Sequence, residues 1–254
     1  MSVIYELDLF HNMLDSLNES ISYYKKAIDD ESKYKFCIIL LSHFMELSLK
    51  YLVEKQNPIL VYEKPYSEKL IKEKTITWGQ ALQILRNCKI EIDENIKKHF
   101  NELALLRNDI IHYKFSYETE NIRNIVVNIV TDVRSIFIKA QLDDFYIKTT
   151  EETQALLNEI KDEYSRELHL AQANAIENAN GEEILDCDIC GEEKTVNLID
   201  GVFHCNFCNE DNSYVDCVRC GDSILESESI HYGETEDGDP IYLCEYCDGV
   251  VNDD

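Results

Sequence analysis

Proline and glycine are scarce in this chain, and its C-terminal half has few basic residues. Its 254 residues include only 3 prolines and 8 glycines, and a single glycine precedes residue 180. Because the turns of a β-rich domain usually contain these residues, their scarcity before residue 180 favours helices in that part of the chain.

Residues 151–254 carry 4 basic and 28 acidic side chains, or −24 of the total formal charge of −26. Such a surface repels polyanions, so we expect this half to favour a basic protein partner over nucleic acid.

The sequence also lacks a long uncharged apolar run. The most apolar window, residues 36–53, is interrupted by His43, Glu46 and Lys50. The first ten residues have neither the basic start nor the apolar stretch of a signal peptide. We therefore expect a soluble protein of the cytoplasm that spans no membrane.

Apolar residues recur every three or four positions through most of the first 150 residues, which is the period of amphipathic helices. We expect helices over residues 3–30, 34–54, 75–85, 93–112 and 118–145. The second has the densest apolar pattern and should be the most buried. Thr75 or Thr77 can cap the third, and Pro58 and Pro65 mark an irregular connection before it. The natural packing of these helices is an all-α bundle over residues 1–148.

The remaining sequence divides into a helical stretch and a cysteine-rich stretch. Residues 149–180 are rich in Ala and Glu and predict a connecting helix that leads away from the bundle. From residue 181 the composition changes to Cys, Gly, Asp and short β-type runs. Asp200–Gly201 and Asp237–Gly238 each indicate a hairpin turn. The expected fold class is therefore mainly α, with a small β-rich module over residues 181–254.

Eight of the ten cysteines fall into four C-x-x-C pairs after residue 186. In a reducing compartment this spacing favours metal ligation over disulfides. A C-x-x-C turn brings two thiolates to one ion, and two such turns complete a tetrahedral site. Sequential pairing gives two sets, the first of Cys187, Cys190, Cys205 and Cys208, the second of Cys217, Cys220, Cys244 and Cys247.

The two sets predict two structural Zn²⁺ ions. Four cysteines per ion leave no open coordination position for a substrate or an activated water. Glycine follows Cys190 and Cys220, as expected where a tight turn needs positive φ. An interleaved cross-brace pairing stays open at this point. His204 and His231 could replace a thiolate, but each is more simply a strand or loop histidine.

A second group of chemically active residues ends the helix predicted over residues 93–112. Arg107, Asn108 and His112 form an R-N-x-x-x-H motif in which Asn108 and His112 share a helical face. Arginine binds phosphate oxygens in a bidentate manner, and histidine can serve as acid or base near neutral pH. In a purely structural interpretation Arg107 pairs with Glu102 or Asp109, and His112 contacts carbonyls at the helix end.

This motif, together with Glu46 inside an apolar helix, resembles the HEPN family (higher eukaryotes and prokaryotes nucleotide-binding domain) over roughly residues 5–145. The resemblance implies a helical domain that dimerises so that two R-x4-H motifs face each other. These would form a metal-independent endoribonuclease site, of the kind used in toxin–antitoxin and antiphage-defence systems. It also implies that Asn108 positions the phosphate or the histidine and that Glu46 orients Arg107.

The leading hypothesis is thus an endoribonuclease that acts on RNA such as tRNA, with the zinc ribbons as a sensor, docking or regulatory module. HEPN domains without nuclease activity also exist, so the alternative is a non-catalytic dimerisation scaffold whose ribbons recruit a protein. A third hypothesis, a zinc-ribbon nucleic-acid binder with a helical dimerisation arm, is disfavoured because Lys194 and Arg219 are the only basic residues of the ribbons.

Overall fold

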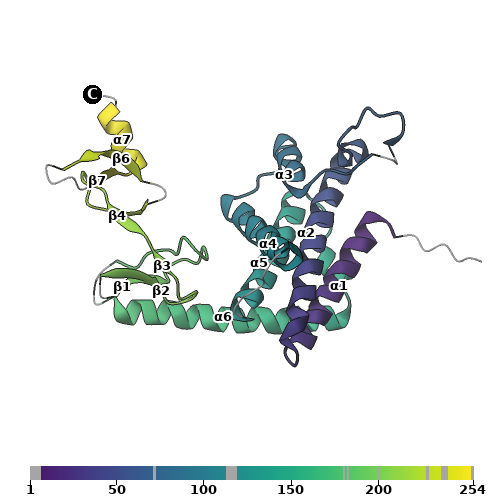
Figure 1. Ribbon diagram of the computed structural model, residues 1–254, viewed down its shortest axis with the longest axis horizontal. Coiled ribbons are helices and arrows are strands. Elements are labelled where there is room, and N and C mark those ends of the chain that lie inside the picture. The colour runs from purple at the N-terminus through teal and green to yellow at the C-terminus, as the bar shows by residue number, and fades with distance from the viewer. Residues whose placement is uncertain are drawn as a thin grey trace, which may run out of the picture. The chain divides into compact units, whose positions relative to one another are not determined.

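The computed structural model describes residues 7–70, 73–112, 119–179, 181, 183–199, 201–226, 229–235 and 240–252. The chain divides into two compact units, Met1–Tyr164 and Ser165–Asp254. The predicted connecting helix is one continuous helix, α6 (Glu151–Asn178), and the division falls within it (Figure 1). The first unit is helical and the second contains the short strands, which confirms the predicted fold class.

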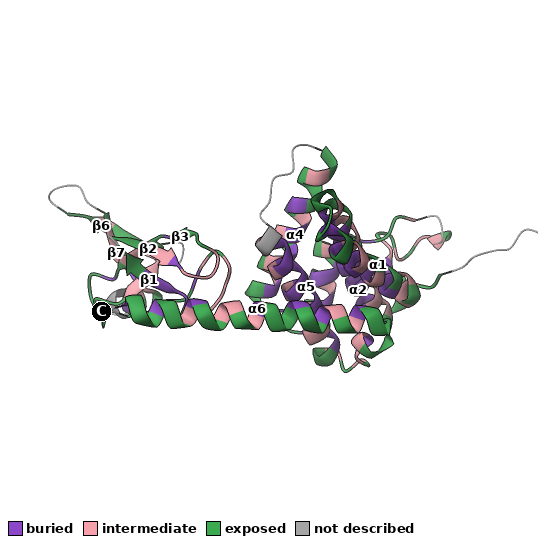
Figure 2. Cartoon of the chain, turned by 90° about the horizontal axis from the view of Figure 1, so that it is seen from below, coloured by how far each residue is buried: buried purple, intermediate pink, exposed green. Residues whose placement is uncertain are grey.

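The described part of the helical unit contains α-helices, short 3-10 turns and the first half of α6. The α-helices are α1 (Leu9–Ala27), α2 (Tyr34–Gln56), α3 (Trp78–Asn87), α4 (Glu94–His112) and α5 (Thr119–Lys139). The 3-10 turns are η1 (Glu31–Lys33), η2 (Pro58–Val61) and η4 (Phe145–Lys148). Helix α2 packs against α1, α3, α4 and α5, and its neighbours turn their buried faces toward it (Figures 1 and 2).

The central place of α2 explains its apolar composition. Its buried side chains include Phe44, Leu49 and Leu52, all 0% exposed, which confirms that the second helix is the most deeply packed. The stretch Glu31–Gln56 is long and apolar enough to cross a membrane, but 67% of its most apolar window is buried inside the unit. The core position of the helix accounts for this apolarity and does not identify a membrane span.

Side chains cap the starts of several helical segments, and some of these caps could be predicted from the sequence. Thr77, and not Thr75, caps α3, because its hydroxyl accepts from the Gln80 amide while the Gln80 side chain accepts from the Thr77 amide. Asn57 accepts from the Ile59 amide and starts η2 at Pro58. The predicted break between the second and third helices is therefore confirmed.

The fifth helix ends earlier than predicted. It was expected to continue to Phe145, but α5 stops at Lys139 and Phe145 lies in the separate turn η4. Gln141 has φ of 58°, and the Leu142 amide donates to the Phe137 carbonyl, as in a Schellman motif. No residue type at this position predicted the end of the helix, because glycine is the usual residue in the left-handed conformation.

An aromatic cluster joins α2, α5 and η4. The ring of Phe145 lies 5.4 Å from that of Phe44 and 5.0 Å from that of Phe137, measured between centroids. Tyr51 stacks on Phe137 at 5.8 Å. These contacts hold η4 on the core and so fix the direction in which α6 begins.

Truncating the centre of this cluster should be costly. We expect Phe137→Ala to lower the free energy of unfolding of the helical unit by about 3–5 kcal/mol, because the side chain is fully buried and leaves a cavity. Its neighbour Ile138 is 63% exposed, so Ile138→Ala should change stability by less than about 0.5 kcal/mol. Urea denaturation followed by circular dichroism measures both, and equal effects would contradict the packing described.

Among its described residues, the second unit contains three small antiparallel sheets and a short helix after them. The first sheet has the order β1 (Val196–Ile199), β2 (Val202–Cys205) and β3 (Asp211–Asn212). The others pair β4 (Tyr214–Asp216) with β5 (Ser223–Leu225) and β6 (Ile230–Glu234) with β7 (Pro240–Leu243), and α7 covers Glu245–Asn252. Gly201, at φ 86°, lies in the predicted first hairpin turn, whereas Asp200 and the predicted turn at Asp237–Gly238 lie outside the described residues.

The second half of α6 belongs to this unit and packs through alanine. Ala171 and Ala175 of α6, together with Ala179 directly after it, are spaced four apart and at most 6% exposed. Gln172 Nε2 donates to the Glu193 carbonyl at 3.0 Å, next to the first cysteine set. Small side chains at this spacing let a helix lie close to a compact module that has little core of its own.

Candidate functional site

The R-N-x-x-x-H motif occupies the last turns of α4. Arg107, Asn108 and His112 are all exposed, and Arg107 Nη1 donates to Asn108 Oδ1 at 3.3 Å. At about 100° per residue, Asn108 and His112 lie about 40° apart around the helix, whereas Arg107 and His112 lie about 140° apart. The guanidinium and the imidazole of one chain therefore leave α4 in different directions.

Arg107 shares its electrostatic surroundings with a polar stripe on α2, the helix against which α4 packs. His43, Glu46 and Lys50 are spaced by three and four residues and lie within about 60° of one another around α2. Lys50 Nζ donates to Glu46 Oε1 at 2.5 Å and to Thr75 Oγ1 at 2.9 Å. The Lys50 side chain is only 10% exposed, so this cation is held firmly in place.

Glu46 is thus bound by Lys50. The family resemblance had instead implied that Glu46 orients Arg107. The predicted role of Glu46 in orienting Arg107 stays a prediction. The sequence did contain a signal for the stripe, since its three members are the only acidic or basic side chains in the apolar window at residues 36–53.

His43 is the titratable group at the centre of this neighbourhood. Its Nδ1 lies 3.0 Å from Ser16 Oγ, and the Ser16 hydroxyl donates its hydrogen to the Asn12 carbonyl. The Ser16 oxygen must therefore accept from Nδ1–H, which leaves the Nε2 lone pair of His43 available. Burial lowers the pKa of His43; Glu46 raises it, and Lys50 and Arg107 lower it further. The imidazole is accordingly neutral at pH 7.

The influence of Arg107 on His43 can be tested without any activity assay. Replacing Arg107 by alanine removes a cation that disfavours the imidazolium, so the pKa of His43 should rise. The ring proton resonances of His43, followed by NMR across pH 5–8, report this value. Arg86→Ala removes an exposed arginine of α3 and should leave the titration of His43 unchanged, whereas an equal shift in both variants would contradict the arrangement.

The first four-cysteine set lies between the Cys187–Cys190 knuckle and the end of β2. Every sulfur of the set is within 4.8 Å of the other three. The Sγ–Sγ distances are 3.6 Å for Cys187 and Cys208 and 3.9 Å for Cys190 and Cys205. Four sulfurs at about 2.3 Å from one ion stand about 3.8 Å apart, so the donors fit a tetrahedral metal.

Local donors support these sulfurs. The backbone amides of Phe207 and Cys208 donate to Cys205 Sγ at 3.4 and 3.5 Å. Thr195 Oγ1 lies 3.2 Å from the same sulfur. Gly191, at φ 76°, donates its amide to the Cys187 carbonyl and closes the knuckle, as its position after Cys190 predicted. Such N–H contacts to sulfur stabilise thiolate ligands.

The second set, Cys217, Cys220, Cys244 and Cys247, meets the same distance criterion but is more open. Its sulfurs also lie within 4.8 Å of one another, with Cys220 and Cys244 Sγ 3.9 Å apart. Cys217 and Cys247 are buried, whereas Cys220 is exposed. Gly221 has φ of 80° and closes its knuckle as Gly191 does.

The structure groups the cysteines sequentially, which resolves the pairing that the sequence left open. Among the described residues, both candidate metal groups consist of cysteine alone. His204 Nδ1 lies 2.9 Å from Asp211 Oδ1, and His231 packs edge-on against Tyr242. Both histidines are therefore engaged elsewhere, as their simpler interpretation predicted.

The pKa lies below the ordinary thiol value for Cys187 and Cys205 in the first set and for Cys217 in the second. Hydrogen bonding with Cys190 lowers the pKa of Cys187 to about 6. A hydrogen bond from the Cys220 amide is the largest effect on Cys217 and lowers its pKa to about 6. Both are thiolates at neutral pH, the form in which cysteine ligates metals. Two metal ions can thus be held at the C-terminal end of the chain.

Neither site is identified by comparison with known proteins. No protein-family model, no curated protein and no solved structure matches the chain. Interpretation of both sites therefore rests on the residues, their spacing and the contacts described above.

Proposed function

We propose that the helical unit is a metal-independent endoribonuclease of the HEPN type, acting in a toxin–antitoxin or antiphage-defence system. The supporting observation is the R-N-x-x-x-H motif in the last turns of α4, where Arg107 Nη1 donates to Asn108 Oδ1 and Asn108 shares a helical face with His112. An exposed guanidinium that can bind phosphate oxygens and an exposed imidazole that can act as acid or base are the groups that RNA transesterification needs.

The chemistry proceeds without a metal ion. The 2′-hydroxyl loses its proton to a histidine and its oxygen attacks the adjacent phosphorus. The bond from phosphorus to the 5′-oxygen breaks, and that oxygen takes a proton from a second side chain, which acts as the general acid. The products are a 2′,3′-cyclic phosphate and a 5′-hydroxyl, and Arg107 neutralises the charge that accumulates on the phosphate oxygens.

The geometry of α4 favours a homodimer for this activity. Because Arg107 and His112 of one chain point about 140° apart, a second copy would bring another Arg107 and His112 to the substrate. Asn108, which already accepts a hydrogen bond from Arg107, would hold the arginine or the phosphate in position.

We also propose that both cysteine sets hold Zn²⁺ in a structural role. The residues Cys187, Cys190, Cys205 and Cys208, and equally Cys217, Cys220, Cys244 and Cys247, would supply four thiolates each. Bound zinc replaces the hydrophobic core that so small a module cannot build. The strong negative charge of this half suits a sensor or regulatory module that docks a basic protein.

A non-catalytic scaffold is the second candidate, and one observation favours it. Leu105 and Ile111 flank the motif on α4 and are 57% and 43% exposed. Exposed apolar side chains beside Asn108 and His112 would serve a protein contact as well as an RNA site. In that case the ribbons recruit the partner and the motif residues contribute to dimerisation.

Incubating the purified protein with total cellular RNA and with tRNA, without added metal, distinguishes the two candidates. The nuclease proposal expects discrete fragments that end in 2′,3′-cyclic phosphate. Absence of cleavage at several salt concentrations, with full-length protein and with the ribbons removed, would favour the scaffold.

A further inference from the structure

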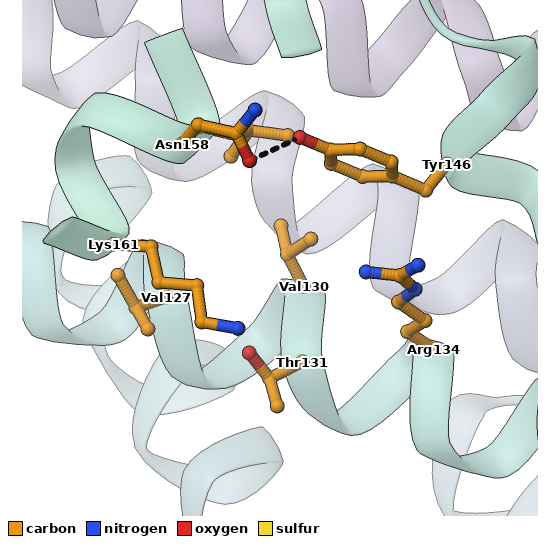
Figure 3. A pocket seen from close by; sticks show the side chains of 8 residues that line it. Val127, Val130, Thr131, Arg134, Tyr146, Asn158 and Lys161 are labelled. Carbon is orange, nitrogen blue, oxygen red and sulfur yellow. Dashed lines mark hydrogen bonds between the residues drawn. The ribbon is translucent and has the colours of Figure 1, made fainter. Parts of the chain in front are cut away.

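A cavity in the helical unit lies apart from the α4 motif, between α5, η4 and the first half of α6. Its volume is about 100 Å³. Figure 3 shows the side chains that line it. Its floor is apolar, because Val127, Val130 and Leu157 are each between 5% and 8% exposed.

The rim carries hydrogen-bond donors. Arg134 uses Nε and Nη2 to bind Asp144 Oδ2, so Nη1 stays available on the cavity side. The Tyr146 hydroxyl donates to Asn158 Oδ1 at 2.8 Å, drawn as the dashed line in Figure 3. The same hydroxyl also lies 3.0 Å from the Gln154 carbonyl, so Tyr146 is held at the rim by two residues of α6.

Lys161 is the cation most clearly directed at the cavity. Its neighbours three and four positions away on α6 are Leu157, Asn158, Tyr164 and Ser165, so no carboxylate stands at helical ion-pair spacing. Lys161 forms no ion pair with any residue that the structure describes. Figure 3 shows its amine turned toward the Thr131 hydroxyl across the cavity.

The charge balance indicates a monoanion. Lys161 and Arg134 contribute two positive charges, and Asp144 cancels one of them through its ion pair with Arg134. A dianionic phosphate would exceed the remaining charge and leave the apolar floor under water. A carboxylate with a short aliphatic tail uses both the donors at the rim and the floor.

We propose that this α5–α6 cavity binds a small aliphatic carboxylate of about three to five carbons. The carboxylate contacts Lys161, Thr131 and Arg134, and the tail covers Val127, Val130 and Leu157. The site is independent of the RNA chemistry proposed for α4 and does not rest on it. A ligand bound there would contact both α5 and the first half of α6.

Isothermal titration of the full-length protein with acetate, propionate, butyrate and valerate, at constant ionic strength, tests the proposal. Affinity should rise about fourfold with each added methylene up to butyrate, because each buries more apolar surface. Butyramide, which lacks the charge, should not bind. Butyrate at ten times its Kd should raise the melting temperature of the helical unit by about 3–6 °C.

Lys161→Met keeps the aliphatic stem and removes the charge, so butyrate binding should weaken by a factor of about 10–100. Lys148→Met removes an exposed lysine of η4 that does not line the cavity, and its affinity should equal that of the wild type. In methyl NMR spectra, butyrate should shift the signals of Val127, Val130 and Leu157 in the wild type and in Lys148→Met. At the same butyrate concentration the shifts should be much smaller in Lys161→Met.

Three results would each overturn the proposal. The first is no binding of any of the four carboxylates at 20-fold excess over about 1 mM protein. The second is equal butyrate affinity in Lys161→Met and Lys148→Met. The third is tighter binding of inorganic phosphate than of butyrate, which would make this a general anion site without use of its floor.

Discussion

Replacing His112 by alanine should lower the rate of RNA cleavage by a factor of about 10²–10⁴, the usual contribution of a positioned acid or base. Arg107→Ala should cost about 10²–10³, because it removes a charged donor to the phosphate oxygens. Arg107→Lys keeps the charge but loses the bidentate geometry and should recover only part of the rate. Cleavage of a fluorescent tRNA under single-turnover conditions measures all three.

The matched control is His169→Ala, which removes an exposed histidine of α6 and should leave the rate unchanged. His112 and Arg107 are exposed as well, so their variants should fold, and circular dichroism verifies this. A wild-type rate in properly folded His112→Ala would reject the assignment of His112. If His43→Gln abolished cleavage in the same series, the imidazole of the α2 stripe would be the acid or base.

Replacing Cys205 by serine should reduce the metal content from two ions per chain to one. Cys205 is fully buried and receives the contacts of Thr195, Phe207 and Cys208, so its loss removes the best supported ligand of the first set. Structural zinc supplies about 10–16 kcal/mol in small domains, so the β1–β2–β3 sheet should unfold with it. Mass spectrometry under native conditions counts the ions, and limited proteolysis detects the unfolded sheet.

The helical unit should survive this change, because its aromatic and aliphatic core lies entirely within Met1–Tyr164. Cys88→Ser is the matched control, since Cys88 is an exposed cysteine outside both sets, and its variant should retain two ions. Loss of both ions from Cys205→Ser would show that the sets are not independent. Retention of both would mean that the first set does not hold a metal.

Most helices could be located from the sequence because their signals are local. The period of apolar residues placed α2 and α4 to within about two residues, and one of the two threonines offered as caps, Thr77, begins α3. The end of α5 could not be located, since Gln141 adopts a left-handed conformation that its residue type does not announce. That turn is stabilised by the packing of Phe145 against Phe44 and Phe137, which are distant in sequence.

Local sequence patterns were enough to identify the two candidate sets of metal ligands, the acidity of the C-terminal half and the α4 motif, because knuckle spacing, composition and helical period are properties of neighbouring residues. The packing of the chain was needed to show that the cysteines group sequentially and that Lys50 of α2 also contacts Thr75, whereas its pair with Glu46 follows the i,i+4 spacing of one helix. It also created the α5–α6 cavity. These features depend on side chains from separate elements meeting in space, and their distances follow from how the helices and knuckles pack, which no local pattern specifies.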